Sequence, residues 1–228
     1  MKRSEINEIM RSADEFIRGS GFRLPPFAYW TPNDWRQKGP EAAEIPQNDL
    51  GWDITDFGHG EFLKTGLLLF TLRNGNPGQP DSKPYAEKIM VAEENQETPM
   101  HFHWTKTEDI INRSGAKLAI ELFMSTDDET LDMVTPVIVS IDGMRHEFKP
   151  GTIVELSPGE SITLTPRMYH RFWGLGGRVL IGEVSAVNDD HNDNRFLLPQ
   201  GRFPAVEEDE EPVHLLVGDY TRFFRGKF

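Results

Sequence analysis

The chain has 228 residues, of which 37% are hydrophobic and 15 are phenylalanine, so it can bury a sizeable core within one decorated domain. Its formal net charge of -13 argues against nucleic acids and anionic membrane surfaces as partners, because both require basic patches. It contains no cysteine, which excludes disulfides, thiolate metal ligands and a cysteine nucleophile.

The N-terminal region, residues 1–58, is predicted to be helical. Apolar residues recur at three- and four-residue spacing from Ile6 to Ile17, with Ser4 as the candidate cap. Thr31, followed by proline, predicts the start of a second, short helix. The first ten residues contain no apolar core of signal-peptide length, and no stretch of the chain approaches about 18 apolar residues. We therefore expect a cytoplasmic protein without a membrane span.

Between residues 60 and 187 the pattern changes to short strands separated by turn residues. The candidate strands are residues 62–72, 85–92, 98–104, 107–112, 118–125, 137–141, 144–148, 152–156, 161–165, 170–174 and 179–187. Asp142 and Gly143 fit a tight hairpin turn. Many short strands at roughly even spacing favour a sandwich or a barrel, so we expect one all-β domain, with residues 188–228 as a C-terminal extension.

The clearest chemical pattern is the segment from His101 to Glu108. Side chains two positions apart on a strand point to the same face, so His101 and His103 should converge. Glu108 follows five residues later, far enough for a tight turn to return a carboxylate beside them. Imidazole and carboxylate together suit Mn²⁺, Fe²⁺, Co²⁺, Ni²⁺ or Zn²⁺. Two histidines alone on a strand face would more often be surface or core residues.

The spacing of these residues, with Gly115 after them, is similar to the first motif of the cupin superfamily. A second cupin-like motif follows, in which Gly159 precedes His170 by eleven residues. The first motif departs from the pattern at Asn95, where cupins have glycine, and the proline of the second is displaced by one. The resemblance implies a cupin barrel, also called a double-stranded β-helix or jelly roll, that binds a divalent metal. The ligands that it implies are His101, His103, Glu108 and His170.

Further segments closely resemble the bacterial D-lyxose isomerases, a cupin family of sugar isomerases. These segments are MKRSEINEI, LPPFAYWTP, HFHWTKTEDIINR, EVSAVNDD, and DNRF followed by GRFPAVEEDE. The resemblance implies interconversion of D-lyxose and D-xylulose, with D-mannose and D-fructose as a second pair. A divalent metal would hold the C1 and C2 oxygens of the sugar during proton transfer through an enediol, and Mn²⁺ is the preferred candidate for this metal. Analogy with other cupins implies a homodimer.

An enediol route also needs a group that carries a proton between C1 and C2. Lys106, at the turn beside the metal ligands, is the first candidate for this role and for binding sugar oxygens, although lysine at a turn is often only solvated. Glu207, in the family-like C-terminal segment, is the candidate base, although acidic runs are usually solvated too. Glu183, Asp190 and Arg195 are the candidate substrate contacts.

Two other functions are compatible with the same residues. An Fe(II)-dependent cupin dioxygenase could use these four ligands to activate oxygen, and a non-catalytic cupin could bind a sugar without converting it. Formation of a ketose from D-lyxose, with Mn²⁺ present and oxygen excluded, would distinguish the isomerase from the dioxygenase.

His191 is a further histidine that could reach the mouth of the barrel.

Overall fold

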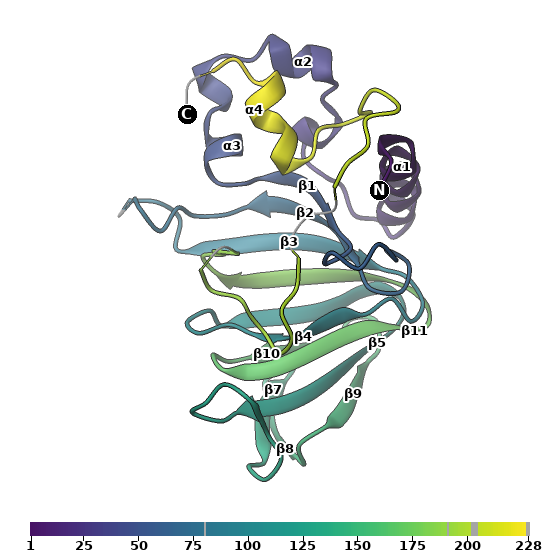
Figure 1. The fold of residues 1–228 in the computed structure, drawn as a ribbon. Coiled ribbons are helices and arrows are strands. Elements are labelled where there is room, and N and C mark those ends of the chain that lie inside the picture. Colours follow the sequence, from purple (N-terminus) through teal and green to yellow (C-terminus); the bar gives the residue numbers. More distant parts are fainter. Residues whose placement is uncertain (80, 191, 202–204, 227–228) are drawn as a thin grey trace.

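The central part of the chain forms one curved antiparallel sheet of twelve strands in the computed structural model, which describes residues 1–79, 81–190, 192–201 and 205–226 (Figure 1). The strands are β1 (Gly51–Thr55), β2 (Leu67–Arg73), β3 (Tyr85–Ala92), β4 (Thr98–Phe102), β5 (Glu108–Ser125), β6 (Leu131–Asp132), β7 (Val137–Ile141), β8 (Met144–Phe148), β9 (Thr152–Leu156), β10 (Ser161–Leu164), β11 (Met168–Ala186) and β12 (Arg195–Phe196). The main strand order is β1-β2-β3-β11-β5-β10-β7-β8, while β4 pairs with β11 and β12, and β6 and β9 pair with β5. The predicted all-β class is confirmed.

The sheet curls into a barrel around an apolar core, and part of it is buried on its outer face as well. In β2, Leu67 and Leu69 pack into the barrel core, whereas Leu68 and Phe70 pack against the N-terminal helix layer. Because both faces of β2 meet apolar partners, its sequence is a continuous apolar run and not the usual alternation of polar and apolar residues. The outer layer therefore closes one side of the barrel.

The helices gather on that outer side, beyond β1 and β2 (Figure 1). They are α1 (Arg3–Gly19), α2 (Pro32–Arg36), α3 (Glu44–Gln47) and α4 (Tyr220–Phe223), with short 3-10 turns at Pro26–Tyr29, Pro40–Ala42 and Val217–Asp219. Thr31 caps α2 as predicted, because its hydroxyl oxygen accepts a hydrogen bond from the Asp34 N–H. Ser4, in contrast, lies inside α1, whose N-cap is Lys2. None of the described helices has the length and apolar character required to span a lipid bilayer.

Two of the predicted strand breaks do not occur. Residues 107–112 and 118–125 belong to the single strand β5, and residues 170–174 and 179–187 fall largely within β11. In β5 the chain turns at Gly115, where φ is +96° and an added Cβ would lie 2.3 Å from the carbonyl oxygen of Arg178. A glycine thus bends the strand without ending it. Asn95, in the place of the motif glycine, also has a positive φ of 58°, which asparagine tolerates.

Helix α1 is joined to the C-terminal segment by a buried arginine. The guanidinium of Arg3 donates two hydrogen bonds to Glu208 and two to Asp219, at 2.8 to 3.0 Å, although its side chain is only 1% exposed. The Arg3 N–H also donates to the carbonyl oxygen of Glu207. The N-terminal and C-terminal regions, which precede and follow the barrel in the sequence, therefore pack against each other as one layer.

Replacing Arg3 with alanine is expected to lower the free energy of unfolding by about 3 kcal/mol, because the partly buried Asp219 and its neighbour Glu208 would lose their countercharge. For a chain of this size the thermal midpoint should fall by about 10 °C. Arg11→Ala is the matched control, since Arg11 lies 3.8 Å from Glu210 in a half-exposed pair and should cost less than about 1 kcal/mol. Equal shifts of the midpoint in calorimetry would contradict this role for Arg3.

Candidate active site

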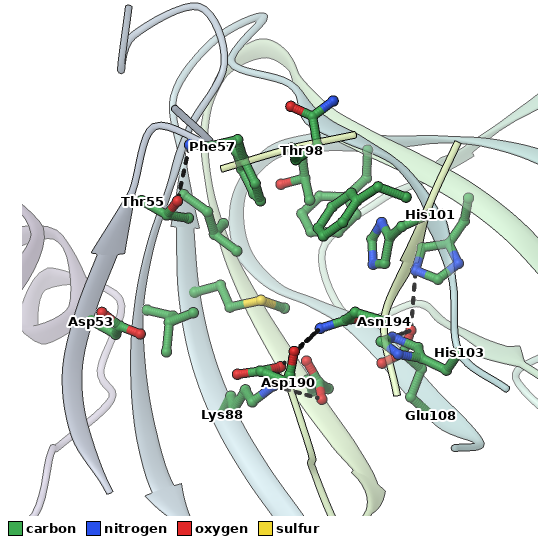
Figure 2. Close-up of a pocket in the computed structure, with 18 of the residues that line it drawn as sticks. Asp53, Thr55, Phe57, Lys88, Thr98, His101, His103, Glu108, Asp190 and Asn194 are labelled. Carbon is green, nitrogen blue, oxygen red and sulfur yellow. Dashed lines mark hydrogen bonds and ion pairs between the residues drawn. The ribbon is translucent and has the colours of Figure 1, made fainter. Parts of the chain in front are cut away.

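A cavity of about 270 Å³ lies inside the barrel (Figure 2). Strands β1, β2, β3, β5 and β11 each line it with residues two positions apart, as expected for side chains on one face of a strand. Strand β4 contributes Thr98 and His101. A further part of the wall comes from residues 188–190 and 192–201, which we name the crossing segment because they pass across the barrel strands (Figure 1). Within it, β12 pairs with β4, so that Phe196 lies opposite His101.

Three histidines converge at one end of this cavity. Ring nitrogens of His101, His103 and His170 lie within 4.8 Å of one another, and all three side chains are buried. The strand register explains the arrangement, because His101 is the direct partner of His170 in the β4–β11 pair. His103 follows two positions later on the same side of the chain. The predicted convergence of the histidines is thus observed.

Each imidazole presents its Nε2 to the centre of this group. The Nδ1 atom of each ring lies 2.6 to 3.0 Å from a main-chain carbonyl oxygen, which fixes the proton on Nδ1. The accepting carbonyls are those of Pro99, Asp193 and Met168. Burial, and then the neighbouring histidines, lower the pKa of His101 well below its usual value. The neutral ring, which is the form that binds metals, is therefore favoured.

Glu108 completes a donor set at the same place. Its Oε1 lies 3.2 Å from Nε2 of His170 and 3.5 Å from Nε2 of His103. Burial alone would raise the pKa of Glu108, but the ammonium of Lys106 and the imidazole of His103 outweigh it and hold the pKa well below its usual range. Three imidazoles and one carboxylate fit a divalent transition metal. The histidine group could hold such an ion, with Glu108 beside it.

A buried series of alternating charges continues from Glu108 along the cavity wall. Nζ of Lys106 lies 2.8 Å from Oε2 of Glu108 and 3.0 Å from Oε1 of Glu183. Nζ of Lys88 lies 3.3 Å from the same Glu183 oxygen, because Lys88 and Glu183 are direct partners in the β3–β11 pair. Burial would raise the pKa of Glu183, but Lys106 and Lys88 lower it. Conversely, the two carboxylates raise the pKa of Lys106 despite its burial.

The other predicted site residues divide into two groups. Asp190 lines the cavity, 4.0 Å from Nζ of Lys88. Arg195 does not line it: in β12 Phe196 faces the cavity, so Arg195 points away and donates to Glu129 at 2.8 Å. Glu207 is exposed, pairs through its backbone with the start of α1, and does not line the cavity either. Of these three residues, the structure therefore places only Asp190 at the cavity. His191 lies outside the described residues.

Several cavity residues were not anticipated from the sequence. Asp53 and Thr55 of β1 lie on the side of the cavity opposite the histidines (Figure 2). The alternation in GWDIT, with Trp52 and Ile54 packed in the outer layer, is the signal that could have revealed this strand. Lys88 carries no such signal, because only the pairing of β3 with β11 places it against Glu183.

Comparison with solved structures identifies the fold. The L-ribose isomerase of Cellulomonas parahominis superposes with a TM-score of 0.60 at 13% sequence identity, covering 91% of this chain and 98% of that one. A mutant L-ribose isomerase of Acinetobacter sp. DL28 gives a TM-score of 0.61 at 13% identity, with the same coverage. At this level of sequence identity the similarity concerns the fold alone. The fold is the cupin fold, which confirms the prediction.

Comparison of sequences identifies the family. The family model described as D-lyxose isomerase matches residues 1–220. The D-lyxose/D-mannose isomerase of Serratia proteamaculans is 50% identical over 227 residues, which cover 98% of this chain and 99% of that protein. The protein of the same name from Escherichia coli O157:H7 is 47% identical over 228 residues, with 98% and 100% coverage. The chain therefore belongs to the D-lyxose isomerase family of aldose–ketose isomerases.

Proposed function

We propose that this isomerase interconverts D-lyxose with D-xylulose and D-mannose with D-fructose, and that it depends on a divalent metal. The observation that carries the proposal is the combination, in one cavity, of a histidine group that could hold a metal with a buried Lys106–Glu183 pair. The names of the two close relatives support the choice of sugars. Mn²⁺ as the native ion, a homodimer and a cytoplasmic location stay predictions.

An ion held by the three histidines and Glu108 would polarise the sugar carbonyl and stabilise the negative charge that develops on its oxygen. The chain itself must move protons. Conversion of an aldose to a ketose removes a proton from C2, delivers one to C1 and transfers a hydroxyl proton from O2 to O1. Glu183 is our candidate for the carbon-bound proton and Lys106 for the protons on oxygen, because both are buried and line the cavity.

The ion pair between these two residues also suggests how the base is activated. Without a sugar, Lys106 lowers the pKa of Glu183 and so weakens it as a base. A sugar oxygen that accepts a hydrogen bond from Lys106 would draw the ammonium away from Glu183. The carboxylate, which is buried, would then become more basic at the moment when the substrate is in place. Lys88 would continue to hold Glu183 in position.

The cavity suits a small neutral sugar. Its volume of about 270 Å³ is close to the lower end of the range for small-molecule pockets. Leu67, Leu69 and Met90 form an apolar wall between the histidines and the polar side chains of Asp53 and Thr55. A monosaccharide with two oxygens at the metal could therefore direct its remaining hydroxyls to Asp53 and Thr55.

Removal of metal tests this function. Protein treated with a chelator should form no ketose from D-lyxose or D-mannose, and Mn²⁺ should restore ketose formation under anaerobic conditions. Circular dichroism of the chelated protein serves as the control for loss of fold. A metal-loaded protein that converts neither sugar would contradict the proposed substrates. Oxygen uptake on another substrate would favour the cupin dioxygenase instead.

A further inference from the structure

The turn between β4 and β5, residues 103–106, is held by a single carboxylate from the crossing segment. Oδ1 of Asp193 accepts a hydrogen bond from the Thr105 N–H at 2.9 Å. Oδ2 accepts from the Thr105 hydroxyl and from the Lys106 N–H, also at 2.9 Å. The main-chain carbonyl of the same aspartate accepts from Nδ1 of His103 at 2.6 Å. One residue thus makes four contacts with one four-residue turn.

These contacts meet a requirement of the turn. Residues 103–106 lie outside the strands, so the N–H groups of Thr105 and Lys106 have no ladder partners, and a buried N–H without an acceptor is costly. Asp193 is only 7% exposed, and its carboxylate accepts both N–H groups together with the hydroxyl. His103 and Lys106 occupy the two ends of the turn, so Asp193 contacts both the residue that faces the histidine group and the residue that faces Glu183.

The crossing segment is itself anchored on both sides of Asp193. Before it, the Asn188 N–H donates to Oδ1 of Asn74 at 3.0 Å. After it, Nε of Arg195 donates to Glu129 at 2.8 Å, and the Gly201 N–H donates to the carbonyl oxygen of Phe57 at 2.9 Å. Asp193 is therefore held in place before any metal or sugar binds. A carboxylate on an anchored segment can hold a turn in one orientation, whereas a carboxylate on an unanchored segment would move with the turn.

We propose that Asp193 is a positioning residue for the metal-binding turn: its side chain sets the orientation of His103 toward the histidine group and of Lys106 toward Glu183. The part that concerns Lys106 rests on the proposed function. The part that concerns His103 rests only on the fit of the histidine group to a divalent ion, and metal binding can be measured without any sugar.

Asp193→Asn is expected to weaken Mn²⁺ binding by about tenfold or more, as is typical when a partner behind a metal ligand is lost. The amide keeps the size of the side chain but directs an NH₂ group at N–H donors that the carboxylate accepted. The measurement is a titration of metal-free protein with Mn²⁺ alone. Asp142→Asn is the matched control, because Asp142 also accepts a main-chain N–H and a hydroxyl, both from Ser161, at a turn away from the cavity.

An Mn²⁺ affinity within about threefold of the wild type for Asp193→Asn would overturn the proposal, even if the thermal midpoint fell, since the residue would then be structural only. If this variant does not fold, Thr105→Val removes one of the three donors to the carboxylate and should weaken Mn²⁺ binding in the same direction, with unchanged affinity again overturning the proposal. A wild-type protein that binds Mn²⁺ but converts neither sugar would contradict the proposed function and leave the titration of Asp193→Asn valid.

Discussion

Glu183→Gln is expected to lower kcat for the isomerisation by about a hundredfold or more, which is the range for loss of a general base. Glutamine has nearly the same shape as glutamate, but it cannot take a proton from carbon. The Mn²⁺ affinity should change little, because the Glu183 carboxylate contacts Lys106 and Lys88 and none of the histidines. The two quantities are measured by steady-state kinetics at saturating Mn²⁺ and by metal titration of the same preparation.

The control for this variant is Glu121→Gln. Glu121 lies on β5 and forms an ion pair with Arg171, but it does not line the cavity, so its kcat should stay at the wild-type value. If kcat of Glu183→Gln also remained within about twofold of the wild type, Glu183 would be removed from proton transfer. Asp190, which lines the cavity near Lys88, would then be the next carboxylate to replace.

His170→Gln is expected to abolish both metal binding and ketose formation at ordinary Mn²⁺ concentrations. His170 is the ligand candidate that connects the others, since it stands opposite His101 and its Nε2 lies 3.2 Å from Glu108. Its loss should lower the Mn²⁺ affinity by more than the roughly 10- to 100-fold seen when only a supporting partner is removed. Metal content after gel filtration and the initial rate of ketose formation give the two readings.

The matched variant is His146→Gln, because His146 lies on β8 and does not line the cavity. It should keep the wild-type metal content and activity. A His170→Gln protein that retained one equivalent of Mn²⁺ and converted D-lyxose normally would show that the ion, if one is used, is held elsewhere.

The histidine end of the cavity could be predicted from the sequence because its signal is local. His101 lies in β4, His103 follows it by two positions, and Glu108 begins β5 after a short turn, so local spacing is enough to bring the three side chains together. His170 lies far away in sequence, but its spacing from Gly159 resembles a known motif. The strand regions around these residues were also predicted, since alternation and turn residues are local properties.

The Lys106–Glu183 end of the cavity was predicted only in part. Lys88 and Asp193 reach it through pairing between distant strands and segments, and nothing in their immediate sequence distinguishes them from solvated charges. Glu207 does not line the cavity, which illustrates the complementary limit: the sequence around it resembles the family, but similarity of a segment does not show which way its side chains point. Glu183 was named from the sequence as a substrate contact, but only the register of β11 against β3 shows that it lies beside Lys88.

The long ladder between β5 and β11 has a consequence for how the protein acquires its activity. It carries Glu108 at one end of β5, and both His170 and Glu183 on β11. Residues so far apart in sequence meet only after contacts of high contact order have formed, and such contacts slow folding. A metal that binds only the assembled site adds to the stability of the native state by mass action. Competence to bind metal should therefore arise late, in the same cooperative step that closes the barrel.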